Sequence, residues 1–432
     1  MRASSGRGRL VAQRACLLTA ILLLPQASPA DTLRPSKPGQ AEELFDKGLA
    51  ALKRNDLVSA ENAFSASLKL DPKAVAPMLG LAQIASKRGQ HQAAVDYVHR
   101  AFLQAPDDAD VQRNWARYKY SEGLYQEAEN ALRHAMQVDP AAARPRIDLG
   151  DLYVLAYRKP AEAIPFYKEA IRLEPKHAGA HYGLGMALGM TGQRMEAVAE
   201  LNQAATLAPT NPLPYYRLGR LHESERRLDQ AMEAFGLALR ARPAFAPAFL
   251  ERGKILLAKN DSAGALREFQ NAAAADSALA EPHLQLGMIY QQRRQWSNAQ
   301  EAYLAAIARN PQEAIAYNNL AWMATESGVQ LNDALKWARK AVSIAPDVSQ
   351  FQTTLGWVQR ARGDLGAAAD ALAKAAAMKP PRADALYYLA IVRLDQGRRA
   401  EGTTLLKKAL ALDPAFSNAP DAQHRLKALD QS

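Results

Sequence analysis

The chain has 432 residues, of which 54 are basic and 44 acidic, so its formal net charge is +10. This excess is mild for the length, and no run of five or six basic residues occurs, which argues against a nucleic-acid-binding stripe. The only cysteine is Cys16, which excludes a disulfide framework and a thiolate metal site.

Residues 1–30 predict a secretory signal peptide. They contain four arginines and no acidic residue, an apolar run over 15–24, and small residues before a cleavage point at Asp31. The run is shorter than the roughly 20 residues that span a membrane. We therefore expect an exported protein, periplasmic or on the outer surface, with no integral membrane segment after cleavage. An uncleaved anchor and an organellar transit peptide are the alternatives.

A flexible leader is expected over residues 31–40, and a periodic region follows over residues 41–414. Within the periodic region a proline returns every 34 or 35 residues, and Ser277 occupies the one position where it is missing. The prolines are Pro72, Pro106, Pro140, Pro175, Pro209, Pro243, Pro311, Pro346, Pro380 and Pro414. Such a period indicates a stack of identical supersecondary units.

Each period predicts two helices joined by a turn. In the second half, small and large residues recur at spacings of four and three, as in Ala94, Val98 and Ala101, which places them on one helix face. The first half carries a Leu-Gly pair such as Leu149 and Gly150. Because glycine costs a helix about 1 kcal/mol relative to alanine, its recurrence indicates close approach of a facing helix. The closing proline ends the second helix.

This pattern of Leu-Gly, alanine, aromatic, alanine and proline over 34 residues resembles the tetratricopeptide repeat. The resemblance covers residues 41–414 and implies an all-α fold, a right-handed α-solenoid (superhelix) of about eleven helix-turn-helix units. Repeats four and nine carry one extra residue each, expected in the turns near 157–160 and 327–331. Residues 415–432 are expected to form a C-terminal capping helix and tail, with the helix over 421–429 and Asp421 capping its start.

The resemblance also implies where a partner binds, because the first helix of each unit in this family lines a concave face. Exposed aromatic residues and arginines are the usual anchors of protein interfaces, so we expect this groove to hold an extended peptide or a partner helix. For any single residue, packing between repeats is the alternative. The candidate groove residues are Arg117, Tyr182, Met186, Tyr216, Arg220, Lys254, Asn318, Trp322, Trp357 and Tyr387.

No catalytic, cofactor or metal site is predicted. His177 and His181 lack the spacing and context of a zinc pair, and the glycines near Gly185 lack a phosphate-binding pattern. We expect a non-enzymatic scaffold that binds one or more proteins and no nucleic acid. Residues 316–357 resemble bacterial envelope repeat proteins, which suggests an accessory to exopolysaccharide or surface-protein export. A periplasmic assembly or maturation chaperone and direct carbohydrate binding along the groove are the alternatives.

Overall fold

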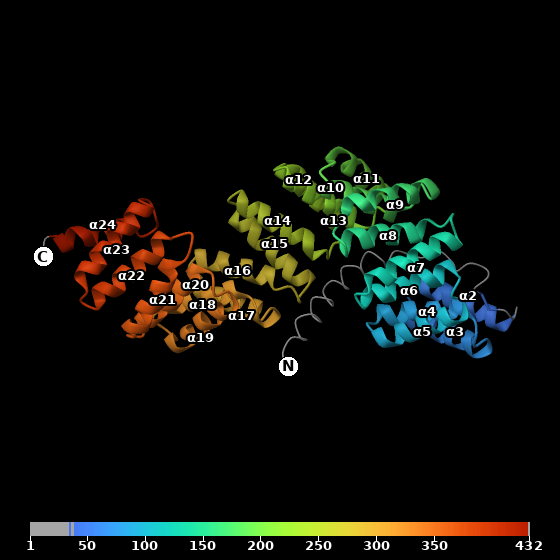
Figure 1. The fold of residues 1–432 in the computed structure, drawn as a ribbon, viewed down its shortest axis with the longest axis horizontal. Coiled ribbons are helices and arrows are strands. Elements are labelled where there is room, and N and C mark those ends of the chain that lie inside the picture. The colour runs from blue at the N-terminus through green and yellow to red at the C-terminus, as the bar shows by residue number, and fades with distance from the viewer. Residues whose placement is uncertain (1–33, 36–38, 431–432) are drawn as a thin grey trace. The chain divides into compact units, whose positions relative to one another are not determined.

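The computed structural model describes residues 34–35 and 39–430 (Figure 1). The predicted signal peptide and most of the predicted leader lie outside these residues. Within them the protein is entirely helical, with 23 α-helices and no β-strand. The chain divides into two compact blocks, one ending at Arg242 and the other beginning at Pro243. We call them the N-terminal and C-terminal blocks.

The helices of the N-terminal block are α2 (Gln40–Lys53), α3 (Leu57–Leu70), α4 (Val75–Lys87), α5 (His91–Gln104), α6 (Ala109–Ser121), α7 (Tyr125–Val138), α8 (Ala143–Leu155), α9 (Pro160–Leu173), α10 (Ala178–Met190), α11 (Arg194–Leu207), α12 (Pro212–Ser224) and α13 (Leu228–Ala241). Those of the C-terminal block are α14 (Ala246–Ala258), α15 (Ser262–Ala275), α16 (Glu281–Gln292), α17 (Trp296–Arg309), α18 (Ala314–Ser327), α19 (Leu331–Ile344), α20 (Ser349–Ala361), α21 (Leu365–Ala377), α22 (Ala383–Asp395), α23 (Arg399–Leu412) and α24 (Ala419–Asp430).

The helices pair into eleven hairpins, from α2 with α3 to α22 with α23, and each hairpin packs against the next one in its block. The even-numbered helices α2 to α22 are the first helices of the hairpins, and the odd-numbered helices α3 to α23 are the second helices. Within each block, first helices also contact one another, as α8 does α10 and α18 does α20. The predicted all-α solenoid is therefore confirmed.

Left-handed residues make the turns inside the hairpins. Gly89 has φ of 72°, and the amide of Gln90 donates to the carbonyl of Ala85 over 2.9 Å. This bond spans five residues and satisfies a carbonyl that the end of α4 leaves open, as in a Schellman motif. The left-handed conformation thus explains why glycine, as at Gly89, Gly192 and Gly363, recurs in these turns.

The two longer turns depart from this geometry. After α8 the amide of Lys159 donates to Tyr153, six residues back, and Arg158 takes the left-handed conformation with φ of 61°. After α18 two left-handed residues, Gly328 and Gln330, occupy one turn. The extra residues of repeats four and nine are accommodated in these turns, as the sequence indicated.

The boundary between repeats persists where the proline is missing. Asp139, before Pro140, is extended with φ of −126° and ψ of 90°. Asp276, before Ser277, has φ of −143° and ψ of 97°, and its Oδ1 accepts from the amide of Ala278 over 3.0 Å. The aspartate turn therefore ends α15 without help from a proline ring.

The recurring glycines make room for large core side chains. Tyr167 of α9 is fully buried between Gly150 of α8 and Gly183 of α10. A Cβ at Gly150 would lie 2.7 Å from the Tyr167 ring, and one at Gly183 would lie 2.3 Å from it. Phe64 lies in the same way between Gly48 and Gly80. The packing explanation of the Leu-Gly pair is confirmed.

The C-terminal helix α24 packs on the last hairpin, and Leu426 and Leu429 contribute to that contact. It begins at Ala419, two residues before Asp421. Asp421 does not cap the helix start, contrary to the prediction. Its carboxylate instead accepts from the Tyr387 hydroxyl over 2.6 Å and pairs with Arg425 over 2.5 Å.

Candidate functional site

In the C-terminal block, three consecutive first helices bring their aromatic side chains together. Trp322 of α18 and Trp357 of α20 both contact Tyr388 of α22. The ring centroids of Trp322 and Tyr388 are 5.8 Å apart at 76°, and those of Trp357 and Tyr388 are 4.7 Å apart at 56°. All three side chains are half-buried, so each keeps accessible surface. We call these three residues the aromatic cluster.

Polar groups surround the aromatic cluster. The Arg360 guanidinium carbon lies 4.5 Å from the centroid of the Trp357 ring, and its Nε pairs with Asp395 over 2.5 Å. The Asn418 amide donates to the Tyr388 hydroxyl over 3.2 Å, while burial raises the pKa of Tyr388. Aromatic surface with hydrogen-bonding groups at its edge is typical of recognition sites.

Asn318 lies one helical turn before Trp322 on α18, hence on the same helix face. Its side chain is only 3% exposed, and its Nδ2 donates to Asn319 over 3.3 Å. Within residues 34–35 and 39–430, its Oδ1 has no hydrogen-bond partner. A buried carbonyl without a donor carries a desolvation cost of about 1–3 kcal/mol.

The other two candidates in this block are engaged by neighbouring residues. Tyr387 is buried, and its hydroxyl donates to Asp421 of α24; burial and then this carboxylate raise its pKa to about 12. Lys254 of α14 pairs with Glu281 over 2.7 Å and with Glu251 over 3.4 Å. Burial acts to lower the Lys254 pKa, but these carboxylates outweigh it and the pKa is raised.

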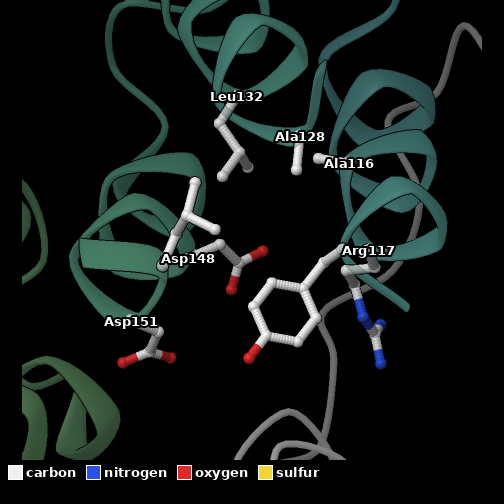
Figure 2. Close-up of a pocket in the computed structure, with 8 residues that line it drawn as sticks. Ala116, Arg117, Ala128, Leu132, Asp148 and Asp151 are labelled. Carbon is white, nitrogen blue, oxygen red and sulfur yellow. The ribbon is translucent and has the colours of Figure 1, made fainter. Parts of the chain in front are cut away.

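In the N-terminal block, Arg117 of α6 lines a cavity that lies between α6, α7 and α8 (Figure 2). Burial and then the nearby Arg113 lower the pKa of Arg117 to about 10. The cavity combines an apolar side with charged groups. It is lined by Ala116, Arg117, Tyr120, Ala128, Leu132, Asp148, Asp151 and Leu152.

The remaining N-terminal candidates divide between packing and surface. Tyr182 and Met186 of α10 are buried in the core, and the Tyr182 hydroxyl accepts from Arg217 over 3.1 Å. The Tyr216 ring packs 5.6 Å from the buried ring of Phe235. Arg220 is exposed and pairs with Glu223 over 3.1 Å. For Tyr182 and Met186 the geometry corresponds to repeat packing, the alternative left open by the sequence.

The two histidines near the start of α10 have structural partners. The His177 side chain accepts from the Ala180 amide and so caps the helix. His181 Nδ1 lies 2.6 Å from Glu200, and its Nε2 lies 2.9 Å from the Pro175 carbonyl. In the part of the chain that the structure describes, no group of three or more metal-ligating side chains occurs. None of the helices there has the length and apolarity that crossing a membrane requires.

Sequence reasoning missed Tyr388 and Asp148. Each lies one residue later on its first helix than a position that the family resemblance assigns to the groove. A strict repeat of those positions therefore excluded it. A usable signal was present, because Asp148 is the ion-pair partner of Arg113, 35 residues earlier. A search for complementary residues one repeat apart would have found the pair.

Stacked helical hairpins with side chains gathered on the first helices define an α-helical repeat protein. Tetratricopeptide repeat family models match residues 284–349 and 353–416, residues 51–114 and 154–205, and residues 214–245. The chain belongs to the tetratricopeptide repeat family.

The chain is similar to parts of larger proteins. It is 28% identical over 128 residues to anaphase-promoting complex subunit 3 of Schizosaccharomyces pombe, covering 30% of this chain and 19% of that protein. It is 24% identical over 266 residues to protein O-mannosyl-transferase TMTC3 of Mus musculus, covering 58% of this chain and 25% of that protein. The chain therefore spans a quarter or less of these relatives. The Cut9–Hcn1 hetero-tetramer structure is 14% identical, with a TM-score of 0.45 over 93% of this chain and 99% of that one.

Proposed function

We propose that the protein is a non-enzymatic scaffold that holds partner proteins on the faces of its first helices. Tetratricopeptide repeat scaffolds typically mediate protein–protein interactions, and this fold gives a long surface built from short-range contacts. The observation that carries the proposal is the aromatic cluster of Trp322, Trp357 and Tyr388, which gathers three half-buried aromatic rings from three separate helices. Aromatic residues of this kind dominate binding free energies at protein interfaces.

The proposed setting is the bacterial cell envelope, with a role as an accessory to exopolysaccharide or surface-protein export. The charge and apolar pattern of residues 1–30 supports export. The resemblance of residues 316–357 to envelope repeat proteins supports the accessory role. Fractionation of cells that express the full chain tests the location: retention of the uncleaved chain in the cytoplasm would contradict it.

Direct carbohydrate binding is the second candidate, and the surroundings of the aromatic cluster favour it. Sugar rings present apolar faces that stack on aromatic rings, together with hydroxyls that need polar partners. The Asn418 amide and the Arg360–Asp395 pair supply such partners beside Tyr388 and Trp357. Variants of the aromatic cluster distinguish the two candidates, because they show whether a protein or a polysaccharide ligand is lost.

The test is affinity capture with residues 31–432 carrying Trp322→Ala and Trp357→Ala together. We expect the double variant to lose protein partners that the unchanged chain captures. Trp296→Ala is the matched control, because Trp296 is 49% exposed on the second helix α17 and lies outside the aromatic cluster. Capture of an unchanged set of proteins by the double variant would contradict the proposal. Loss of polysaccharide alone would favour the carbohydrate candidate.

A further inference from the structure

The first helices α6 and α8 of the N-terminal block place charged residues side by side. Arg113 of α6 donates from Nε to Asp148 of α8 over 2.6 Å, and its NH1 nitrogen lies 3.5 Å from Asp110. The Arg113 and Asp148 side chains are only 7% and 10% exposed. Burial acts to lower the Arg113 pKa, but these carboxylates outweigh it and the pKa is raised. Arg113 and Asp148 therefore satisfy each other.

Two further arginines on the same helices lack such a partner. Among the described residues, no acidic side chain lies within 4.0 Å of the guanidinium of Arg117 or of Arg144. Both side chains are half-buried. Burial and then the positive charge of Arg113 lower the pKa of each. A partly desolvated cation that also faces a like charge gains most from an incoming anion.

A small cavity lies beside Arg117. Ala116, Ala128 and Leu132 give it apolar walls, and Asp148 and Asp151 lie on the α8 side (Figure 2). The charge of Asp148 is balanced by Arg113. Burial raises the pKa of Asp151 to about 7, so this carboxyl is half neutral near neutral pH. Asp110, Asp148 and Glu174 also act on Arg144 from beyond ion-pair distance, so in the described part of the chain Arg117 and Arg144 are the cations here that have no direct ion-pair partner.

We infer that this face of α6 and α8 binds an acidic segment of a partner protein, with aspartate or glutamate carboxylates pairing with Arg117 and Arg144. The inference rests on the proposed protein-binding function and adds the charge of the partner at a second place on the chain. Bidentate pairing of a guanidinium with a carboxylate gives strength and orientation.

The charge pattern favours separate carboxylates over a nucleic-acid backbone. Asp148 acts on both arginines and Asp110 acts on Arg144, and these carboxylates would repel a continuous row of phosphates. His177, which caps the start of α10, also interacts with Arg113 and Arg144, but burial lowers its pKa, so it adds little positive charge near pH 7. Two separate arginines with carboxylates near them are better matched by acidic side chains that are spaced along a peptide.

Asp151 gives the site a distinctive pH dependence. Its carboxyl faces Asp148 on its own helix and the Tyr167 hydroxyl of α9, and it shares the cavity with Arg117 and Tyr120 of α6. Deprotonation of Asp151 adds a negative charge to the wall of the cavity that Arg117 also lines. The affinity for an acidic peptide should therefore fall as pH rises from about 6 to 8.

The test measures binding of a fluorescent peptide, acetyl-GAEGEGEAG-amide, to the full chain by anisotropy, with the glutamine analogue GAQGQGQAG as reference. We expect the glutamate peptide to bind at least tenfold more tightly than the analogue. Arg117→Gln and Arg144→Gln should each weaken its binding about three- to tenfold, while Arg117→Lys retains part of it. Asp151→Asn should remove the change in affinity between pH 6 and 8.

The matched control is Arg240→Gln, which removes one positive charge from an exposed position on the second helix α13. Equal weakening by this variant would show general electrostatic attraction and overturn the inference, as would equal binding of the two peptides. If the Arg117 and Arg144 variants weakened binding of a 12-nucleotide single strand of DNA more than binding of the glutamate peptide, the site would be assigned to nucleic acid instead. If the arginine variants have no effect but the tryptophan variants still lose captured proteins, the inference fails while the proposed function stands.

Discussion

The Tyr167 hydroxyl of α9 donates a hydrogen bond of 2.6 Å to Oδ1 of Asp151 on α8, and both side chains are buried. Burial, and then the carboxylate, raise the pKa of Tyr167 well above its usual value. Burial also raises the pKa of Asp151, to about 7, against the opposing effect of the Tyr167 hydrogen bond. One hairpin thus holds an ionisable group that favours its neutral form.

Asp151→Asn should stabilise the protein above pH 7. Folded Asp151 binds a proton with a pKa of about 7, whereas the unfolded chain releases it near 3.8, so the unfolding free energy contributed by this group falls as pH rises from about 4 to 7. The difference is on the order of 4 kcal/mol. Asparagine can still accept from Tyr167 and carries no charge. Thermal unfolding midpoints at pH 5 and 8 check this.

The control for that comparison is Asp107→Asn, because Asp107 is 85% exposed. Its midpoints should follow those of the unchanged protein at both pH values. If Asp151→Asn showed the same decline from pH 5 to 8 as the unchanged protein, the raised pKa of Asp151 would be disproved.

Gly183→Ala and Gly236→Ala should have opposite effects on stability. A Cβ at Gly183 would lie 2.3 Å from the fully buried Tyr167 ring, so alanine there should cost about 1–3 kcal/mol or more through overpacking. Gly236, inside α13, has open space around its Cα, so alanine there should add about 0.5–1 kcal/mol through helix propensity. Urea unfolding of the two variants measures the difference. A stabilised Gly183→Ala protein would refute the close-approach explanation.

Arg113→Gln should destabilise far more than Arg172→Gln. Removal of Arg113 leaves the Asp148 carboxylate nearly buried and without its ion-pair partner, which costs about 3–5 kcal/mol. The pair of Arg172 with Glu169 is exposed on α9, so its loss should change the unfolding free energy very little. Equal losses in urea unfolding would show that the Arg113–Asp148 pair is as well solvated as the surface one.

Several contacts between adjacent first helices join residues that are one repeat length apart in the sequence. Arg113 with Asp148, Arg360 with Asp395, and Tyr182 with Arg217 are each separated by 35 residues. The proline period predicted the stack of hairpins, the turns and the glycine packing, because each of these depends on contacts within one repeat or with the next. Pairs of specific side chains separated by one repeat could be predicted from the same period.

The aromatic cluster was only half predictable. Trp322 and Trp357 were expected on the candidate face, but their shared contact with Tyr388 depends on how α18, α20 and α22 pack, since Trp322 reaches across two repeats. Burial of Met186 and the engagement of Lys254 by acidic neighbours were likewise invisible in a register of helix positions. A periodic sequence fixes which face a residue belongs to, whereas its exposure depends on the neighbours that the packing supplies.

Ser277→Pro should stabilise the C-terminal block by restoring the proline that every other repeat has. Asp276 already has the extended backbone that precedes a proline, and within the described chain the Ser277 amide donates no backbone hydrogen bond that proline would remove. The gain should be about 0.4–1 kcal/mol, because proline restricts the unfolded chain. Ser277→Ala is the control and should have little effect, since the Ser277 carbonyl, which accepts from Arg309, is present in both variants. A lower unfolding midpoint for Ser277→Pro than for Ser277→Ala would show that this boundary needs a backbone conformation which proline cannot adopt.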